Sequence, residues 1–252
     1  MADSCKLRVS GLVKRFGGLT ATDGASFEVA TGEVHALIGP NGAGKTTLIH
    51  QISGMLRPDG GRISMDGADI TLLPMHRRVH LGLARSYQIT SVFKTFSVLD
   101  NVAMAVQART GGSRGFWRRA RGEADLFGQA LHALERVGLA ARADAPARSL
   151  SHGEQRRLEV ALALATAPSL LLLDEPMAGM GSDESEAMVD LLLGLRGEIT
   201  MLLVEHDMNA VFRLADRISV LVYGRVIATG SPDAIRRDPE VCKAYLGDEE
   251  PA

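Results

Sequence analysis

The chain has 252 residues, 46% of them hydrophobic, and a formal net charge of −2 from 28 Lys and Arg against 30 Asp and Glu. This composition is typical of a soluble globular protein with one domain or two closely joined ones, and it excludes a disordered chain. The balanced charge argues against a broad basic surface, so we expect no nucleic-acid partner. Cys5 and Cys242 lie near opposite ends without metal-ligand spacing, which argues against a zinc site or a disulfide framework.

The sequence has no pattern typical of a signal peptide or a membrane span. Its first ten residues, MADSCKLRVS, lack a cationic start and an apolar core. The longest apolar tract, at 161–173, is interrupted by Thr166, Pro168 and Ser169 and is shorter than the roughly 18 apolar residues that a spanning helix needs. We therefore expect a cytosolic location.

Short apolar runs alternate with helical patterns along the chain, which predicts an α/β fold. The run VHALI at 34–38 ends at Gly39, as a buried strand does when it enters a tight turn. A helix is expected from Gly44 onward, and Tyr223 and Gly224 are expected to form a hairpin turn. The other expected strands are 7–13, 25–29, 62–65, 84–88, 170–173, 201–204, 218–222 and 226–229.

Between 97 and 167 the strand pattern is replaced by helical periodicity, with Val98, Val102 and Val106 at every fourth position. We interpret 97–167 as a helical subdomain inserted into a core formed by 1–96 and 168–252, the whole chain being a single domain. Within the insertion, five arginines between 109 and 121 surround Phe116 and Trp117. They are either a solvated loop or a contact with membrane head groups or a membrane partner.

A complete G-x-x-x-x-G-K-[ST] pattern, GPNGAGKT, follows the VHALI strand directly. Glycines let the backbone wrap around a phosphate with its N–H groups pointing inward, and the next helix adds its positive end. Lys45 is expected to reach the terminal phosphates, and Thr46 to offer its hydroxyl to Mg²⁺. The residues expected to hold the phosphates are Gly39, Pro40, Asn41, Gly42, Ala43, Gly44, Lys45, Thr46 and Thr47.

Two further groups of polar residues follow apolar strands. In LLLLDE at 170–175, Asp174 is expected to lie beside the magnesium, and Glu175 is expected to orient or deprotonate the attacking water. His206 follows another apolar strand and is expected to contact the γ-phosphate, because ligands of open α/β sheets bind at the carboxyl ends of the strands.

The segment LSHGEQ at 150–155 contains Ser151 and Glu154 at the spacing of a capping box, which begins a helix expected to run to Ala167. Ser151, Gly153 and Glu154 also lie at a helix N-terminus, where free N–H groups bind anions. A second phosphate-binding element in one chain is useful if it closes over ATP held by another copy.

Taken together, these motifs resemble those of ATP-binding subunits of ABC transporters over nearly the whole length. GPNGAGKTT is similar to the Walker A loop, LLLLDE to the Walker B strand and LSHGE to the ABC signature. The resemblance implies a Q-loop glutamine at Gln88, a switch histidine at His206 and an adenine-stacking ring at Phe16. It also implies a P-loop NTPase fold of the ABC ATPase type, with a RecA-like core sheet, an N-terminal antiparallel β-subdomain and an inserted α-helical subdomain.

Finer details resemble the branched-chain amino acid class of importers, which shares much with urea and amide importers. The segments FGGLTATDGASFEV, RSYQ, DEPMAGM and DPEVCKAYLGDE carry this likeness. The chain departs from common family forms at His152 and Glu154, at Phe16 in place of Tyr, and at Gly181, where many members carry Asp.

The resemblance implies an ATPase that couples hydrolysis to transport, with two such subunits burying two ATP molecules between them. Lys45, Gln88 and Mg²⁺ held by Thr46, Gln88 and Asp174 would neutralise charge, while Glu175 and His206 position the water and the γ-phosphate. The implied partners are transmembrane permease subunits, a second identical or paralogous ATP-binding subunit and, indirectly, a periplasmic solute-binding protein. The implied location is the cytoplasmic face of the inner membrane.

There are three alternative interpretations of the function. A nucleic-acid or ribosome ATPase would need a coiled-coil insertion or a tandem ATPase unit. A small-molecule kinase has no use for LSHGE. The remaining alternative is the ATPase of an exporter, for example of lipopolysaccharide, and the sequence leaves both the direction of transport and the cargo open.

Overall fold

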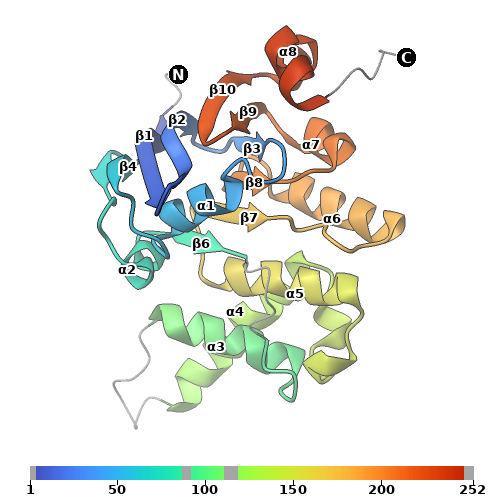
Figure 1. Ribbon diagram of the computed structural model, residues 1–252. Helices are drawn as coiled ribbons and strands as arrows, with labels where there is room; N and C mark the ends of the chain where they lie inside the picture. Colours follow the sequence, from blue (N-terminus) through green and yellow to red (C-terminus); the bar gives the residue numbers. More distant parts are fainter. Residues whose placement is uncertain (1–3, 87–91, 111–118, 247–252) are drawn as a thin grey trace.

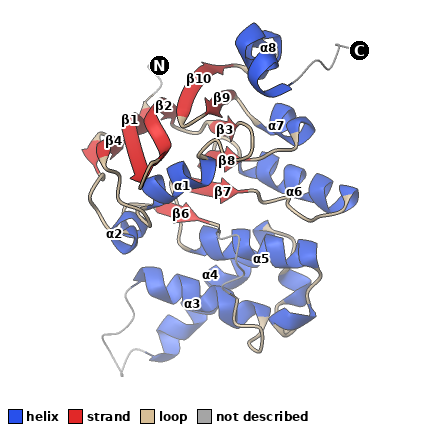
Figure 2. Cartoon of the chain, in the orientation of Figure 1, coloured by secondary structure: helices blue, strands red, loops and turns tan. Residues whose placement is uncertain are grey.

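The computed structural model describes residues 4–86, 92–110 and 119–246. Two sheets form the upper part of the molecule in Figure 1, and a group of helices lies below them. Figure 2 shows the same division, since all strands lie in the upper part and the lower part contains helices and loops. The fold is thus a mixed α/β architecture.

The smaller sheet is antiparallel and comes from the N-terminal part of the chain, in the order β2-β1-β4-β5. Phe16 ends the first strand and pairs with Leu19 at the start of the second, so the hairpin turn leaves Phe16 at its tip. The strands are β1 (Cys5–Phe16), β2 (Leu19–Ala30), β4 (Gly60–Met65) and β5 (Ala68–Asp69).

The larger sheet has the order β10-β9-β3-β8-β7-β6 and is parallel except for its edge strand β10. Leu37 and Asp174 both align with Val204, so β3, β7 and β8 end at one edge of the sheet. Residues that follow these strands are therefore brought together. The strands are β3 (Val34–Ile38), β6 (Leu83–Arg85), β7 (Leu170–Asp174), β8 (Thr200–Val204), β9 (Arg217–Val222) and β10 (Arg225–Gly230).

The predicted turn at Tyr223 and Gly224 is confirmed, because both residues have left-handed φ angles of 48° and 77° and join β9 to β10. The strand expected at 84–88 is β6, which already ends at Arg85, and positions 87 and 88 lie outside the described residues.

Helix α1 (Lys45–Ser53) lies between the two sheets and buries Leu48, Ile49 and Ile52 completely in a cluster that contains residues of both. The hydrophobic contact on both sides fixes the position of its N-terminus relative to β3. The other helices of the upper part are α2 (Met75–His80), α6 (Ser182–Leu195), α7 (Met208–Leu214), α8 (Pro232–Arg237) and α9 (Pro239–Val241), followed by the π-helical turn η3 (Cys242–Leu246).

The lower helices share a separate apolar cluster with the underside of the large sheet. The periodicity of Val98, Val102 and Val106 is confirmed, since all three are buried on one side of α3. The elements are α3 (Val98–Thr110), α4 (Arg119–Arg136), η1 (Ala140–Arg142), η2 (Ala147–Ser149) and α5 (His152–Ala165).

Helix α5 begins with the predicted capping box, in which Ser151 and Glu154 satisfy each other's backbone N–H groups. It ends at Ala165 and not at Ala167, because Ala167 adopts a left-handed φ of 50° before Pro168. Within the described ranges, no helix combines the length and the apolar character needed to cross a membrane.

Candidate functional site

The loop between β3 and α1 has the geometry of a phosphate cradle. Gly44 is the N-cap of α1 and has a φ of 102°, so the chain turns there into the helix with its first N–H groups free. A Cβ on Gly44 would lie 2.1 Å from the carbonyl oxygen of Ala21, and one on Gly39 would lie 2.0 Å from that of Leu221. Both positions therefore require glycine.

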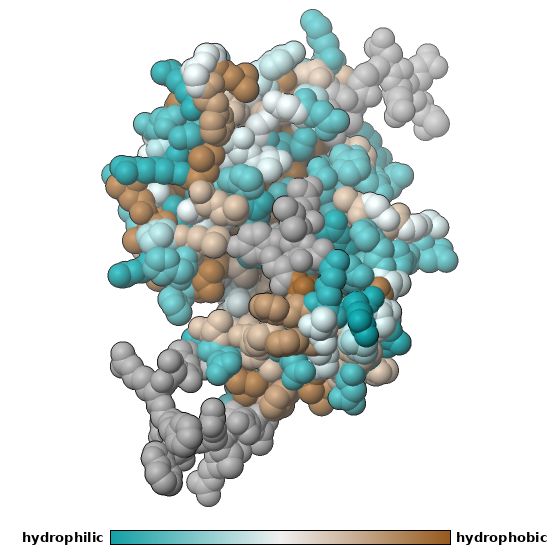
Figure 3. All heavy atoms as spheres, turned by 60° about the horizontal axis from the view of Figure 1, so that its bottom comes forward, coloured by the Kyte–Doolittle hydropathy of each residue, from teal (hydrophilic) through white to brown (hydrophobic). Residues whose placement is uncertain are grey.

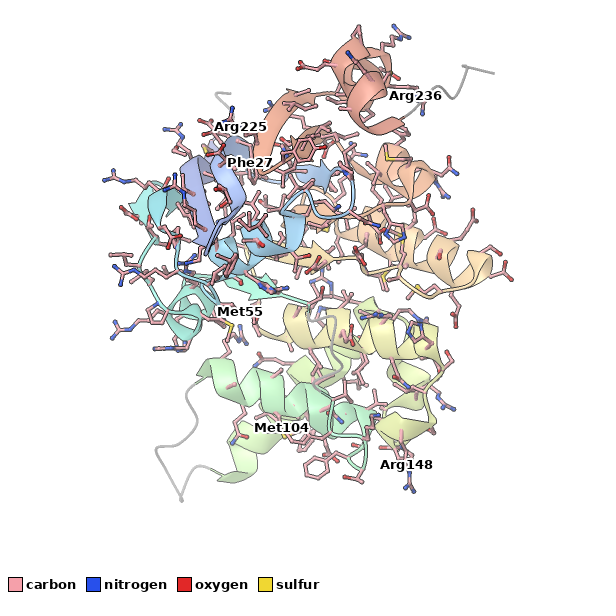
Figure 4. The ribbon with its side chains drawn as sticks, viewed as in Figure 1. Phe27, Met55, Met104, Arg148, Arg225 and Arg236 are labelled. Carbon is pink, nitrogen blue, oxygen red and sulfur yellow. The ribbon has the colours of Figure 1, made fainter. Side chains whose placement is uncertain are left out.

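The β9–β10 turn and the small sheet hold this loop in place. The N–H of Gly224 donates to the carbonyl of Ala43 at 2.9 Å, and the N–H of Asp23 donates to the carbonyl of Gly224 at 2.9 Å. Arg225 adds an ion pair to Asp23 at 2.6 Å, and Figure 4 labels Arg225 beside β2. Residues from distant parts of the sequence thus fix one loop.

Lys45 folds back over the loop that precedes it. Its Nζ donates to the carbonyls of Gly39 at 2.6 Å and Pro40 at 3.0 Å, and the residue is buried. Burial lowers the pKa of Lys45, while the carboxylates of Glu175 and Asp174 oppose this shift. The ammonium group and both carboxylates therefore lie in one electrostatic environment, as the sequence predicted.

Asp174 lies at the end of β7 and is 3% exposed. Its Oδ2 accepts from Arg85 at 2.9 Å, whereas its Oδ1 is buried and has no hydrogen-bond partner within the described part of the chain. Burial raises the pKa of Asp174, and Arg85 opposes the rise. A buried carboxylate oxygen without a donor fits a hard cation.

Glu175 follows Asp174 with a left-handed φ of 49°, a conformation that non-glycine residues adopt rarely and often at functional sites. Its N–H donates to the carbonyl of Val204 at 2.8 Å, which ties it to β8. His206 lies two residues beyond the end of that strand, and its side chain is 61% exposed. The sequence predicted that Glu175 and His206 lie at one sheet edge, and the strand register agrees.

Glu205 is a residue that the sequence analysis missed. Its buried carboxylate accepts from the N–H of Met177 at 3.0 Å and from the N–H of His206 at 3.0 Å. It thereby links the segment after Glu175 to the histidine. Its only sequence signal is its place between an apolar strand and His206.

Among the remaining predicted phosphate residues, Asn41 and Gly42 are exposed on the loop and Thr46 is exposed in the first turn of α1, while Gly44 and Thr47 are half-buried. Phe16 is 49% exposed at the hairpin tip, and Lys14 Nζ lies 5.6 Å from its ring centroid. Its neighbour across the hairpin, Leu19, is two residues from Ala21, which contacts Gly44. A planar ligand could thus stack on Phe16 next to the loop.

The signature residues lie in a different layer from the loop, at the start of α5 (Figure 1). Ser151 Oγ accepts from the N–H of Glu154 at 3.2 Å, and the N–H of Ser151 donates to Glu154 Oε2 at 2.8 Å. Glu184 from α6 also contacts this helix start, which the sequence analysis did not foresee.

Two predictions fall outside the described residues. Gln88 lies within 87–91, so its assigned role stays a prediction. Most of the arginine-rich segment, including Phe116 and Trp117, is likewise outside, although Arg109 is described and its guanidinium donates to Gln129 Oε1. Both interpretations of that segment stay predictions.

A groove of about 330 Å³ lies between the core and the lower helices, bounded by β6, α3 and α5. Phe93 lines it and stacks on Phe96, and both rings are about half exposed. Figure 3 turns the bottom of Figure 1 forward and shows apolar side chains over parts of the helical half. Exposed aromatic rings beside an apolar groove are typical of a protein interface.

Comparisons with known proteins give a consistent result. Residues 22–178 match the family model described as ABC transporter. Residues 225–251 match the model described as branched-chain amino acid ATP-binding cassette transporter.

Three curated relatives match almost end to end. The high-affinity branched-chain amino acid transport ATP-binding proteins BraF of Pseudomonas aeruginosa and LivG of Escherichia coli are each 40% identical, over 96% of this chain and 98% of the relative. The lipopolysaccharide export system ATP-binding protein LptB of Acidithiobacillus ferridurans is 39% identical, over 96% of this chain and 97% of its own.

Solved structures agree on the fold. A nucleotide-free ATP-binding cassette from an ABC transporter superimposes with a TM-score of 0.84 at 31% identity, covering 97% of this chain and 100% of the other. An ATP-binding cassette in its ADP conformation gives a TM-score of 0.85 at 31% identity, over 97% and 99%. The predicted fold class is thus confirmed.

Proposed function

This chain belongs to the family of ABC transporter ATP-binding proteins, and we propose that it hydrolyses ATP to energise the import of branched-chain amino acids or a related small polar solute such as urea or an amide. The observation that carries the substrate class is the match of residues 225–251 to the branched-chain amino acid model. The 39% identity to LptB supports an exporter ATPase as the second candidate. That C-terminal match favours import.

ATP is held in this proposal by two parts of the fold. The adenine stacks on the exposed ring of Phe16, and the phosphates bind the backbone N–H groups between Gly39 and Thr47. Lys45 is already oriented over this loop by its bonds to Gly39 and Pro40, so little side-chain entropy is lost on binding.

Asp174 and the hydroxyl of Thr46 are the described groups that would hold Mg²⁺, with Gln88 added from the motif. No cluster of three or more His, Cys, Asp or Glu suited to a metal occurs among the described residues. This fits an ion bound by few protein ligands together with substrate phosphates. When bound, Mg²⁺ supplies charge neutralisation at the phosphate oxygens.

Hydrolysis then depends on residues at the edge of the large sheet. Glu175, held by its unusual backbone and by Val204, orients and deprotonates the attacking water. His206, whose backbone is fixed by Glu205, contacts the γ-phosphate, and Lys45 neutralises developing charge. The remaining contacts to the γ-phosphate come from Ser151, Gly153 and Glu154 of a paired subunit, identical or paralogous.

The partners in this proposal are transmembrane permease subunits that dock in the groove beside Phe93. Its apolar lining and the stacked pair of Phe93 and Phe96 support an apolar helix as the occupant. The chain would then lie peripherally on the cytoplasmic face of the membrane and act on a periplasmic solute-binding protein only through the permease.

The substitution Glu175→Gln tests the catalytic part of the proposal. The amide keeps the size of the side chain but cannot accept the proton of the water, so steady-state hydrolysis should fall by at least about 100-fold. ATP binding should stay within about twofold of the wild type, and an ATP-bound pair of subunits should accumulate in size-exclusion chromatography with light scattering. Normal hydrolysis by this variant would remove Glu175 from the mechanism.

A further inference from the structure

The start of α5, which the proposed function assigns to the partner's γ-phosphate, holds a carboxylate of its own chain. Glu184 Oε1 lies 3.3 Å from Ser151 Oγ and 3.3 Å from the N of Gly153, and both groups donate to it. A Cβ on Gly153 would lie 2.5 Å from Glu184 Cδ, so the glycine permits this approach. The carboxylate uses the same donors that a phosphate would use.

The position of Glu184 is favourable because two helices begin beside it. It is the third residue of α6, which starts at Ser182, and its side chain reaches the start of the neighbouring helix α5. Helix N-termini stabilise a negative charge, because their free N–H groups and the helix dipole are positive there. The donors that the structure gives to the Glu184 carboxylate are the hydroxyl of Ser151 and the N–H of Gly153, both at the start of α5.

A carboxylate and a γ-phosphate cannot share these donors. Both carry negative charge, and two anions at hydrogen-bond distance from one N–H repel each other strongly. Binding of the partner's nucleotide must therefore displace the side chain of Glu184. ADP has no γ-phosphate and therefore cannot displace Glu184 from these donors.

We infer that Glu184 is a positioning residue that competes with the partner's γ-phosphate for Ser151 and Gly153, so that closure of the two subunits requires ATP to displace its side chain. The inference rests on the proposed function, because it assumes that the signature faces the partner's nucleotide. Glu184 keeps the donors ordered in the open state and raises the ATP concentration needed for closure.

The test compares Glu175→Gln with the double variant Glu175→Gln, Glu184→Gln, using the full chain together with its paired subunit. Light scattering at increasing ATP gives the concentration at half-maximal closure. The amide of Gln has the same shape but no charge, so we expect this concentration to fall at least threefold, with an unchanged melting temperature for the nucleotide-free protein. The neighbouring acid Asp183 is exposed in the same turn and makes no contact with Ser151 or Gly153, so Asp183→Asn is the matched control.

An unchanged or raised half-maximal concentration for Glu184→Gln would overturn the inference, as would an equal decrease for Asp183→Asn. If the Glu175→Gln protein never closes with ATP, the proposed function fails and this inference fails with it. If it closes but Glu184→Gln has no effect, only the inference fails. Closure of the double variant at lower ATP, without such a decrease for Asp183→Asn, supports the inference.

Discussion

At the scale of single residues, the buried ion pair of Arg85 and Asp174 explains how a carboxylate can be kept ready for a cation. Both side chains are at least 94% buried, and removal of one partner from such a pair leaves an uncompensated charge in a medium of low polarity. Arg85 also donates to Ser53 Oγ at 3.4 Å and Met55 Sδ at 3.1 Å, so it joins β6 to the end of α1. Figure 4 shows Met55 on the side of the core that faces α3.

The substitution Arg85→Met should therefore lower the free energy of unfolding by about 3–5 kcal/mol at pH 7. Burial already raises the pKa of Asp174, and loss of Arg85 raises it further. A carboxyl group whose pKa is higher in the folded state stabilises the protein below its unfolded pKa, and this contribution is lost as the pH rises through the folded pKa. The loss of unfolding free energy in Arg85→Met, measured by urea unfolding, should thus be smaller at pH 5 than at pH 7.

Two variants complete this test. Asp174→Asn added to Arg85→Met should recover part of the loss, because no charge is left buried. Arg136→Met removes a more exposed pair with Glu198 and should cost about 1 kcal/mol or less. Equal deficits at both pH values would contradict the assignment of the loss to the Asp174 charge.

A buried series of three hydrogen-bonded side chains shows that geometry alone does not make a catalytic site. Glu33 Oε1 lies 2.8 Å from His35 Nδ1, and His35 Nε2 lies 2.8 Å from Ser219 Oγ, as in a hydrolase triad. His35 is fully buried and stacks on Phe27 of β2, which Figure 4 labels. A substrate cannot reach these groups, so their role is structural: the hydrogen bonds join β3 to β9.

Residue-scale predictions from the sequence succeeded where the spacing was local. The capping box of Ser151 and Glu154 spans four residues, and the P-loop spans eight, so their geometry follows from the pattern. Arg85 and Glu184 were missed because their partners are 89 and 31–33 residues away, and such pairs depend on tertiary packing that local periodicity does not encode.

At the scale of elements, the short helix α2 is attached to α1 by one buried arginine. Arg78 is 1% exposed and donates to the carbonyls of Gln51 and Ile52 at the end of α1, and also to those of Leu73 and Thr71. Burial lowers the pKa of Arg78 to about 10. The guanidinium thus satisfies helix-end carbonyls that would otherwise be buried without donors.

Replacement of this guanidinium by Arg78→Met should lower the free energy of unfolding by about 2–4 kcal/mol, since several buried carbonyls lose their donors at about 1–3 kcal/mol each and partly regain water. The measurement is chemical denaturation, and the exposed neighbour Arg77→Met is the control, with an expected change below about 0.5 kcal/mol. A similar loss in both variants would contradict the assignment of the effect to the buried carbonyls that Arg78 satisfies.

Elements with a strong apolar pattern were predictable, and short polar ones were not. VHALI and LLLLD are fully buried in the sheet, so their composition alone identifies them as strands. Helix α2 has the sequence MHRRVH, in which Arg78 is the only buried residue, so no apolar periodicity marks it. The end of α5 was misplaced by two residues because Ala167 gives no composition signal for its left-handed turn.

At the scale of the whole molecule, the groove between the core and the lower helices is the surface through which a movement of these helices would be transmitted to a membrane partner. Met104 of α3 lines it, as does Glu159 of α5, whose pKa is raised by burial. Glu159 Oε1 has no hydrogen-bond partner within the described part of the chain, so a donor on the docking helix would satisfy it.

The substitution Phe93→Ala should weaken binding to the permease subunits about tenfold, because truncation of an interface aromatic commonly costs more than 1 kcal/mol. The rate of ATP hydrolysis by the isolated subunit should not change, since Phe93 lines the groove and is not among the residues proposed to hold ATP. Co-purification of the complex measures the effect. Leu131→Ala, an exposed apolar residue of α4 outside the groove, should have no effect, and equal weakening by both variants would contradict the docking site.

The central claim is that each ATP lies between the P-loop of one subunit and the signature of the other. An ATP analogue with a photoreactive group on its γ-phosphate tests it directly, in complexes where a tagged Lys45→Ala copy of this chain is paired with a subunit that has an intact P-loop. Lys45→Ala removes binding to the chain's own loop, so the account predicts that residues 150–156 of the tagged copy are still labelled by the partner's nucleotide. Loss of that label, with the partner's ATP still bound, would contradict the account.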